Sequence, residues 1–415
     1  MSPRKGGTPS IEYSLLLTAT LCLLAFGVVM VFSASSTTSL LGDSGDGAYY
    51  LKRTALFGVL GLLMMRFLTI GGVKLVRTLT PVILGVSFVL CFAVLLPGIG
   101  VEVNGAKRWI GAGLIQIQPS EVMKVALILY GAQLLATRPK LTRSVRTMMP
   151  YLAVVASACL LVVVEPDLGT AMVVCFATAA LLVAAGARIR DLALIAAALS
   201  VLVLLAILIE PYRMQRLTGF IDPSSDPNGV GFQSIQAKIA LGSGGIFGVG
   251  LGESLQKAFY LPEAHTDMIA AVIGEELGMV GIAGVVGLFG LFGYAGLQIA
   301  KNARDRYGKL LAAGLTSLVL VQAVINLFAV LGLAPLTGVP LPFVSYGNSS
   351  MLVMLAAVGL LLNIARGGSV GSAARPSSDG GRLRVVDGSA TGGHSRGGNR
   401  GTRSSGAGRR RRATR

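Results

Sequence analysis

The sequence predicts an all-α integral membrane protein with about ten transmembrane helices, and its composition supports this class. Of the 415 residues, 53% are hydrophobic and only 13% are charged, which is about half the charged fraction of an average soluble domain. The mean hydropathy is +0.72. Apolar runs long enough to cross a bilayer recur along the chain. These runs are continuous rather than alternating, which excludes a transmembrane β-barrel.

Ten apolar segments account for the predicted helices. Polar or turn-forming residues separate each segment from the next, and the eighth segment is long enough to contain a break. The predicted spans cover residues 13–32, 55–70, 82–96, 122–135, 151–164, 171–185, 192–209, 267–299, 310–331 and 351–364.

The distribution of basic residues predicts how the chain is oriented in the membrane. Lys and Arg gather in the connectors after the second, fourth, sixth and eighth spans and in the C-terminal tail. Because basic connectors stay in the cytoplasm, this pattern places both termini there. Residues 210–266 then form a large extracytoplasmic loop between the seventh and eighth spans.

The chain divides into three predicted parts. Residues 1–11 are a cytoplasmic N-terminal segment, residues 12–366 form the membrane domain, and residues 367–415 are a tail of Gly, Ser and Arg that we expect to be disordered. Much of the net charge of +17 lies in this tail and the rest in short loops, which is the positive-inside pattern rather than a nucleic-acid signal. The four cysteines form no C-x-x-C pair, so neither a zinc site nor a disulfide framework is expected.

The predicted outer face carries basic residues against the positive-inside tendency, which points to an anionic ligand at the outer membrane surface. These residues are Lys107, Arg108, Arg213, Arg216, Lys238 and Lys257. Lys107 and Arg108 precede the only tryptophan, Trp109. The three side chains form either an interfacial anchor or a clamp for a diphosphate, whose oxygens suit Arg and Lys.

A carboxylate, Asp267, stands at the start of the eighth predicted span, after the turn-forming residues 260–266. The helix dipole favours a negative charge at this position, so Asp267 is a candidate functional group. The alternative is that Thr266 or Asp267 only caps the helix.

Ionisable residues at the ends of other spans are compatible with several roles. Glu121 and Lys124 lie three residues apart, so they can pair on one helical face. Such groups are costly in a membrane and usually line a cavity, although a purely structural pair fits as well. A proton relay in a transporter and a catalytic cleft both remain possible for this pair and for Glu165, Asp167, Glu275 and Glu276.

Six stretches together resemble one known family. They are residues 28–36 (VVMVFSASS), 104–110 (NGAKRWI), 118–121 (QPSE), 165–170 (EPDLGT), 260–278 and 338–350. In these stretches the chain resembles the SEDS family, the shape, elongation, division and sporulation proteins of bacterial cell-wall synthesis, and its cell-division branch most of all. In one small departure, Gly347-Asn348 stands where the family has two glycines after a tyrosine.

The resemblance implies ten transmembrane helices and a peptidoglycan glycosyltransferase that polymerises lipid II at the outer face of the bacterial cytoplasmic membrane, at the division septum. It also implies a class B penicillin-binding transpeptidase and other divisome proteins as partners, and no nucleic acid. The catalytic aspartate of the family falls on Asp267, which would act as general base for the attacking hydroxyl.

The resemblance also implies which residues meet lipid II. Cations would stabilise the leaving diphosphate, and a divalent cation (Mg²⁺ or Mn²⁺) could assist them; no other cofactor is expected. The expected substrate-binding residues are Lys107, Arg108, Trp109, Gln118, Ser120, Glu121, Lys124, Asp167, Arg213, Gln233, Gln236, Lys257, His265, Thr266, Ser345, Tyr346 and Ser349.

Two other functions remain open. A lipid II flippase should carry charges near mid-span and often contains internal repeats, whereas the charges here gather at the outer ends of the spans and no convincing repeat is visible. A non-catalytic divisome scaffold would use the basic tail to bind acidic partners or anionic lipids. Asp267 would then be a dispensable helix cap.

Overall fold

The computed structural model describes residues 10–41, 45–103, 106–112, 115–209, 211–223, 229, 231–257 and 261–368. Nearly all of the predicted disordered tail (from residue 369 on) and of the predicted N-terminal segment (residues 1–9) lies outside these residues.

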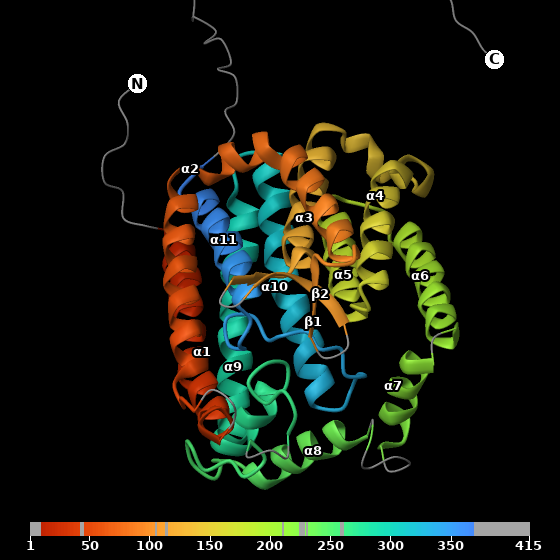
Figure 1. Ribbon diagram of the computed structural model, residues 1–415. Coiled ribbons are helices and arrows are strands. Elements are labelled where there is room, and N and C mark those ends of the chain that lie inside the picture. Colours follow the sequence, from red (N-terminus) through yellow and green to blue (C-terminus); the bar gives the residue numbers. More distant parts are fainter. Residues whose placement is uncertain are drawn as a thin grey trace, which may run out of the picture. The chain divides into compact units, whose positions relative to one another are not determined.

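Helices dominate the described residues, and α1, α9, α10 and α11 run side by side (Figure 1). The helices are α1 (Ile11–Leu41), α2 (Tyr49–Val94), α3 (Pro119–Thr137), α4 (Val145–Val164), α5 (Leu168–Ala184), α6 (Ile189–Ile209), α7 (Pro211–Ile221), α8 (Phe232–Gly244), α9 (Ile269–Asn302), α10 (Arg306–Val330) and α11 (Asn348–Ala365), with a short 3-10 helix at Pro139–Arg143.

The predicted class of polytopic helical membrane protein is confirmed. Within the described ranges, six helices are long and apolar enough to cross a membrane: α1, α2, α4, α9, α10 and α11. The predicted spans at 122–135, 171–185 and 192–209 coincide with α3, α5 and α6. Each of the ten predicted segments therefore falls largely on a helix, although the ends differ by several residues.

Helix α2 corrects the prediction of two spans separated by a break. It is one helix of 46 residues, which would be about 69 Å long if straight, whereas the hydrocarbon core of a bilayer is about 30 Å thick. Its ribbon instead bends across one end of the helical bundle (Figure 1). The expected connector near Lys74 and Arg77 is part of this helix.

The two ends of α2 pack on different neighbours. In the first part, Gly61 lies against Leu355 of α11, and Met65 lies against Gly359 of the same helix. In the second part, the hydroxyl of Ser87 donates to Met123 Sδ of α3 at 3.3 Å. The two predicted spans are therefore both present, and only the break between them is wrong.

Helix α9 contains the break that its length predicted. Gly278, the tenth residue of the helix, has φ 65° and ψ −160°. The backbone N–H groups of Val249 and Gly250 donate to the freed carbonyls of Glu275 and Glu276, each at 3.0 Å. Only glycine fits at 278, because a Cβ there would collide with the backbone of the segment that follows α8.

The large predicted loop between the seventh and eighth spans is partly helical. It contains α7 and α8, and α8 packs directly on α9. Gly244 at the end of α8 touches the backbone of Gly274 in α9. The glycine-rich run at 242–252 therefore permits close packing of this segment on α9.

A small sheet between α2 and α3 was missing from the all-α prediction. Strands β1 (Gly100–Val103), β2 (Ala106–Ala112) and β3 (Ile115–Ile117) form an antiparallel sheet in the order β1-β2-β3. Val101 pairs with Trp109, and Ile110 pairs with Ile117. Strands this short give too few alternating positions to be recognised in a glycine-rich segment.

We expect Gly359→Ala to destabilise the protein, because a Cβ at this position would lie 2.6 Å from the carbonyl oxygen of Met65. The two helices must separate, at a cost of about 1–3 kcal/mol in unfolding free energy. Gly290→Ala in α9 is the matched control, since a Cβ there meets nothing within 4 Å. Thermal unfolding in detergent, followed by size-exclusion chromatography, measures both. Equal midpoints for the two variants would contradict the assigned α2–α11 contact.

Candidate active site

The segment between α10 and α11, residues 331–347, organises the region around Asp267. Two buried amides of α10 hold its backbone. Asn326 Nδ2 donates to Val339 O and also to Asp267 O, each at 2.8 Å, and Gln322 Nε2 donates to Pro340 O at 3.0 Å. Asn326 therefore joins the turn before α9 to the segment before α11. We call residues 331–347 the central loop.

Asp267 is half-buried immediately before α9. Its Oδ1 accepts a hydrogen bond from Thr266 Oγ1 at 3.2 Å, and its Oδ2 faces Gly338 of the central loop. The N-cap position of α9 is Met268, which makes no side-chain cap. Neither Thr266 nor Asp267 occupies the N-cap position, so the capping alternative loses its main support.

An aromatic cluster lies next to this turn. The ring centroid of Tyr50, at the start of α2, is 4.2 Å from that of His265 and 4.8 Å from that of Tyr346. The backbone N–H of Tyr346 also donates to His265 O at 2.9 Å. Burial lowers the pKa of His265 below its usual value, so the imidazole is neutral at pH 7. The two predicted residues His265 and Tyr346 are thus brought together by a third, Tyr50, that sequence reasoning missed.

A second group of predicted residues lies beside the central loop near Thr337. Gln118 Nε2 donates to Asp167 Oδ2 at 2.9 Å, and the backbone N–H of Gln118 donates to Ser349 Oγ at 3.0 Å. Asp167 also caps α5 by accepting from the N–H of Thr170. Next to it, Gly169 touches the backbone of Thr337 in the central loop. The loop therefore has Asp267 beside residue 338 and the Asp167 end of α5 beside residue 337.

The basic residues of β2 divide into two kinds. Arg108 donates to the backbone carbonyls of Glu165 and Pro166, so its guanidinium fixes the turn between α4 and α5. Lys107 is exposed, and Trp109 is half-buried. Of these three, Lys107 is the side chain most open to a ligand.

The predicted pair of Glu121 and Lys124 forms behind the central loop. The two side chains are 2% and 0% exposed, and Lys124 Nζ lies 2.8 Å from Glu121 Oε1. Lys124 Nζ also donates to Gln322 Oε1 at 2.8 Å. Gln322 in turn donates a hydrogen bond to Pro340 O. The ion pair therefore stabilises the central loop from within the helices. Ser120 in the same helix is completely buried.

The remaining predicted residues lie around the turn before α9 or away from it. Gln233 of α8 donates to Pro262 O at 3.3 Å, which places it against that turn, and Gln236 is half-buried on the same helix. Ser345 Oγ accepts from the N–H of Leu341 inside the central loop. The side chain of Arg213 lies outside the described residues.

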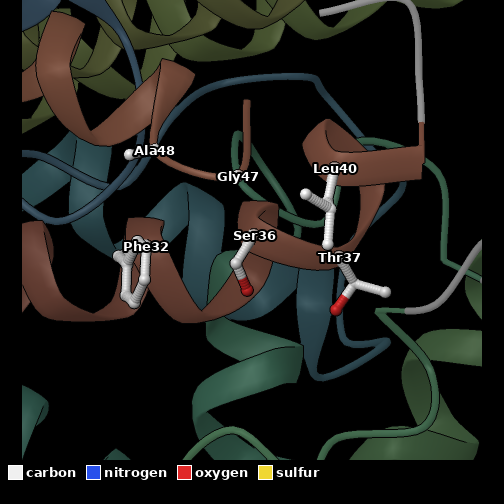
Figure 2. Close-up of a pocket in the computed structure, with 6 residues that line it drawn as sticks. All are labelled: Phe32, Ser36, Thr37, Leu40, Gly47 and Ala48. Carbon is white, nitrogen blue, oxygen red and sulfur yellow. The ribbon is translucent and has the colours of Figure 1, made fainter. Parts of the chain in front are cut away.

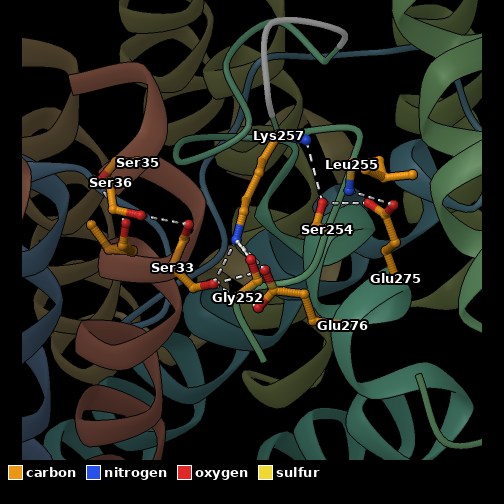
Figure 3. Close-up of polar contacts among 10 residues, drawn as sticks. Ser33, Ser35, Ser36, Gly252, Ser254, Leu255, Lys257, Glu275 and Glu276 are labelled. Atoms are coloured by element: carbon orange, nitrogen blue, oxygen red, sulfur yellow. Dashed lines mark hydrogen bonds and ion pairs between the residues drawn. The ribbon is translucent and has the colours of Figure 1, made fainter. Parts of the chain in front are cut away.

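Lys257 differs most from its expected place. Its ammonium pairs with Glu276 Oε1 at 2.8 Å and also donates to Ser33 Oγ and Gly252 O (Figure 3). With only 3% of its surface exposed, it is held inside the protein. Its hydrogen bonds therefore connect it to α1 and α9 rather than to an open anion site.

Three residues of this region were not predicted: Tyr50, Gln322 and Asn326. The two amides did carry a signal, because they lie four residues apart on one face of an apolar span, where polar groups are costly unless they are used. Tyr50 carried no sequence signal that distinguished it from an interfacial aromatic residue.

The donor set near Asp267 is poor for a protein-held metal. No group of three His, Cys, Asp or Glu side chains is placed to hold an ion anywhere in the described ranges. Mg²⁺, however, commonly uses one or two carboxylates together with substrate phosphates. Asp267 fits the role of such a single protein ligand.

A pocket of about 440 Å³ opens between the end of α1 and the start of α2, directly before Tyr49 and Tyr50 in the sequence. Its lining is mainly apolar, with two hydroxyl groups (Figure 2). The lining residues are Phe32, Ser36, Thr37, Leu40, Gly47 and Ala48.

Known proteins share this architecture. A structure described as "Structural coordination of polymerization and crosslinking by a peptidoglycan synthase complex" matches with a TM-score of 0.70 and 29% identity, over 85% of this chain and 96% of that one. The rod shape determining protein RodA of Thermus thermophilus matches with a TM-score of 0.60 and 26% identity, over 85% and 95% of the two chains. The fold is thus that of the SEDS class of polytopic membrane proteins.

Sequence comparison agrees with the fold. Stage V sporulation protein E of Bacillus subtilis is 42% identical over 85% of this chain and 96% of its own length. A protein named probable peptidoglycan glycosyltransferase FtsW, from Trichlorobacter lovleyi, is 42% identical over 86% and 94%. The profile of the FtsW/RodA/SpoVE cell cycle proteins matches residues 13–369. The chain belongs to this family, as the resemblance of its motifs predicted.

We expect Asn326→Ala to lower the unfolding free energy by about 1–3 kcal/mol, because the carbonyls of Asp267 and Val339 lose their donor inside the protein. Asn302→Ala is the control, since Asn302 is exposed and bonds only Glu12 at the surface. Thermal unfolding of both variants in detergent tests this. A midpoint for Asn326→Ala equal to that of the control would contradict the assigned bonds.

Glu165, in the turn between α4 and α5, should make stability depend on pH. Burial raises the pKa of its carboxyl from 4.5 to about 8; Asp167 adds to this effect, while the Cys91 thiol and Arg108 oppose it. The folded protein therefore holds this proton more tightly than the unfolded chain, and its contribution to stability is full below pH 4.5 and is lost as the pH rises to 8.

We accordingly expect Glu165→Gln to remove part of the decline in stability between pH 5 and 8, by about 2–4 kcal/mol. Thermal midpoints of both proteins across this range give the answer. Parallel pH curves for the native protein and the variant would show that Glu165 titrates normally.

Proposed function

We propose that this protein is a peptidoglycan glycosyltransferase that polymerises lipid II at the outer face of the cytoplasmic membrane, with Asp267 as general base. The observation that carries the proposal is the fixed position of Asp267. Its carbonyl is bonded to Asn326, the preceding His265 is bonded to Tyr346, and its carboxylate is half-buried rather than enclosed. A catalytic base needs this combination of fixed position and access to substrate.

The reaction requires one proton transfer and one displacement. The 4-hydroxyl of one disaccharide attacks the anomeric carbon of a lipid-linked chain. The new glycosidic C–O bond forms as the bond to the polyprenyl diphosphate breaks, and the hydroxyl proton passes to the carboxylate of Asp267. A single base suits displacement with inversion, because the diphosphate is a good leaving group that needs no acid.

The negative charge of the leaving diphosphate has to be stabilised. Lys107 is exposed on β2, so we assign it the first role there. Arg53 of α2 is a further candidate, since its charge acts on both Tyr50 and Tyr346. Lys257 is withdrawn from this role because Glu276 and Ser33 already engage its ammonium. If a divalent cation is bound, Asp267 would be its protein ligand and the cation would add positive charge for the leaving group; the role of Asp267 as base applies without the cation.

The apolar pocket at the junction of α1 and α2 offers a place for part of a polyprenyl chain. It is followed directly by Tyr49 and Tyr50, and the ring of Tyr50 lies against His265. A lipid tail in this pocket would therefore bring its headgroup to the turn that carries Asp267.

The partner and the location follow from the family. We infer that the protein works with a class B penicillin-binding transpeptidase and other divisome proteins, because the matching structure is described as coordinating polymerization and crosslinking in a peptidoglycan synthase complex. Its place would be the division septum, with both termini in the cytoplasm.

The test is polymerisation of fluorescent lipid II by the purified protein together with its transpeptidase partner. We expect Asp267→Asn to slow polymerisation by about 10²–10⁴-fold, the usual contribution of a general base. Glu263→Gln is the matched control, because Glu263 is a carboxylate of the same turn that is exposed and bonds Thr266.

Three outcomes are informative. Glycan ladders from the native protein and the control, but not from Asp267→Asn, support the proposal. Equal ladders from all three remove Asp267 from catalysis. If none forms ladders although the partner is bound, transport or scaffolding is the better function, and the buried ion pairs at Lys124 and Lys257 would then be examined for transport.

A further inference from the structure

A buried polar network lies outside the candidate active site, and it joins three segments that are far apart in the sequence (Figure 3). Lys257, Glu275 and Glu276 are 3%, 2% and 0% exposed. Glu276 accepts from Lys257 Nζ at 2.8 Å and from Ser33 Oγ at 2.7 Å. The network thus connects α1, the segment after α8, and α9.

The neighbouring carboxylate is bound as fully as Glu276. Glu275 accepts hydrogen bonds from the hydroxyl of Ser254 and from the backbone N–H of Leu255. Ser254 Oγ in turn accepts from the N–H of Lys257 at 3.3 Å. Burying charges is costly even when they are paired, and apolar residues would often give equal or greater stability. A role in fixing the geometry therefore explains these buried charges better than a contribution to stability does.

The geometry that this network fixes is that of the first turns of α9, before Gly278. Gly278 breaks the helix, so residues 269–277 form a separate rigid piece about 13 Å long. Asp267 precedes one end of this piece, and Glu275 and Glu276 are near its other end. A rotation or shift of the piece at Glu276 is therefore transmitted to Asp267.

We propose that the Lys257–Glu276 pair, completed by Ser33, is a positioning device for Asp267 that acts through the first turns of α9, residues 269–277. Lys257, Glu276 and Ser33 are positioning residues, since their side chains bond one another and the backbone of Gly252. The inference rests on the proposed role of Asp267 as base. Loss of the device moves the base relative to the acceptor hydroxyl, so it lowers kcat more than it raises KM. A displacement of about 1 Å can cost about 10²-fold in rate.

Helix α1 offers a matched pair of variants. Ser33 and Ser35 are both buried in α1, but Ser33 Oγ donates to Glu276 whereas Ser35 Oγ donates only to Val31 O within its own helix. We expect Ser33→Ala to lower kcat for lipid II polymerisation by about 3- to 10-fold with KM nearly unchanged. Ser35→Ala should retain the native kcat. Glu276→Gln should lower kcat further, and Lys257→Arg should retain more activity than Lys257→Met.

A second measurement does not depend on glycosyltransferase activity. Hydrogen exchange of the peptide covering residues 261–276 should become faster in Ser33→Ala and Glu276→Gln, and stay at the native rate in Ser35→Ala. Faster exchange with unchanged polymerisation, together with an active Asp267→Asn, would show that the network positions this turn but that Asp267 is not the base. Native exchange rates and native kcat in both Ser33→Ala and Glu276→Gln would overturn the positioning role itself. Equal loss of kcat and of thermal stability in Ser33→Ala and Ser35→Ala would also overturn it.

Discussion

The amide of Asn326 is the contact on which the geometry around Asp267 depends. It is 2% exposed in α10, and its Nδ2 bonds the carbonyls of Asp267 and Val339. These two carbonyls belong to the turn before α9 and to the central loop, which the hydrogen bond from Tyr346 N–H to His265 O also joins. A buried carbonyl without a donor is costly, so the Asn326 amide favours one relative position of the two segments at Asp267 itself. The aromatic cluster at Tyr50 and the Gln322 amide then fix the surroundings of this contact.

The helices of the fold were predictable, because long apolar runs have few alternatives in a chain of this hydropathy. The possibility of a break in α9 was also predictable, from the length of the apolar segment. The continuity of α2 through Lys74 and Arg77 was not, since charged residues mark a membrane surface without saying whether the helix ends there. Likewise, the sheet of β1, β2 and β3 depends on pairing between short strands, and local patterns do not determine that pairing.

The site shows the same division between local and non-local information. Asp267, Gln118 and Ser349 stand in distinctive local motifs, so the sequence singles them out, and the structure brings Gln118 and Ser349 into contact. Tyr50 acts through contacts with remote segments, which no local pattern reveals, and the spacing of Gln322 and Asn326 marks two polar groups without giving their partners. Lys257 is the opposite case, a residue that the sequence singled out for a role that the structure does not support. Its charge suggested an anion site, but the partner that decides its role, Glu276, is found only in three dimensions.

The break at Gly278 has a consequence for how the protein relates to its membrane. A transmembrane helix responds to a thicker or thinner bilayer by tilting. The segment after α8 bonds both sides of this break: Val249 and Gly250 donate to the carbonyls of Glu275 and Glu276, and Met279 and Val280 donate to the carbonyls of Gly245 and Ile246. Tilting of α9 would then be taken up beyond residue 280, away from the turn that carries Asp267. The same chain can keep its carboxylate at a constant place in membranes of different acyl-chain length.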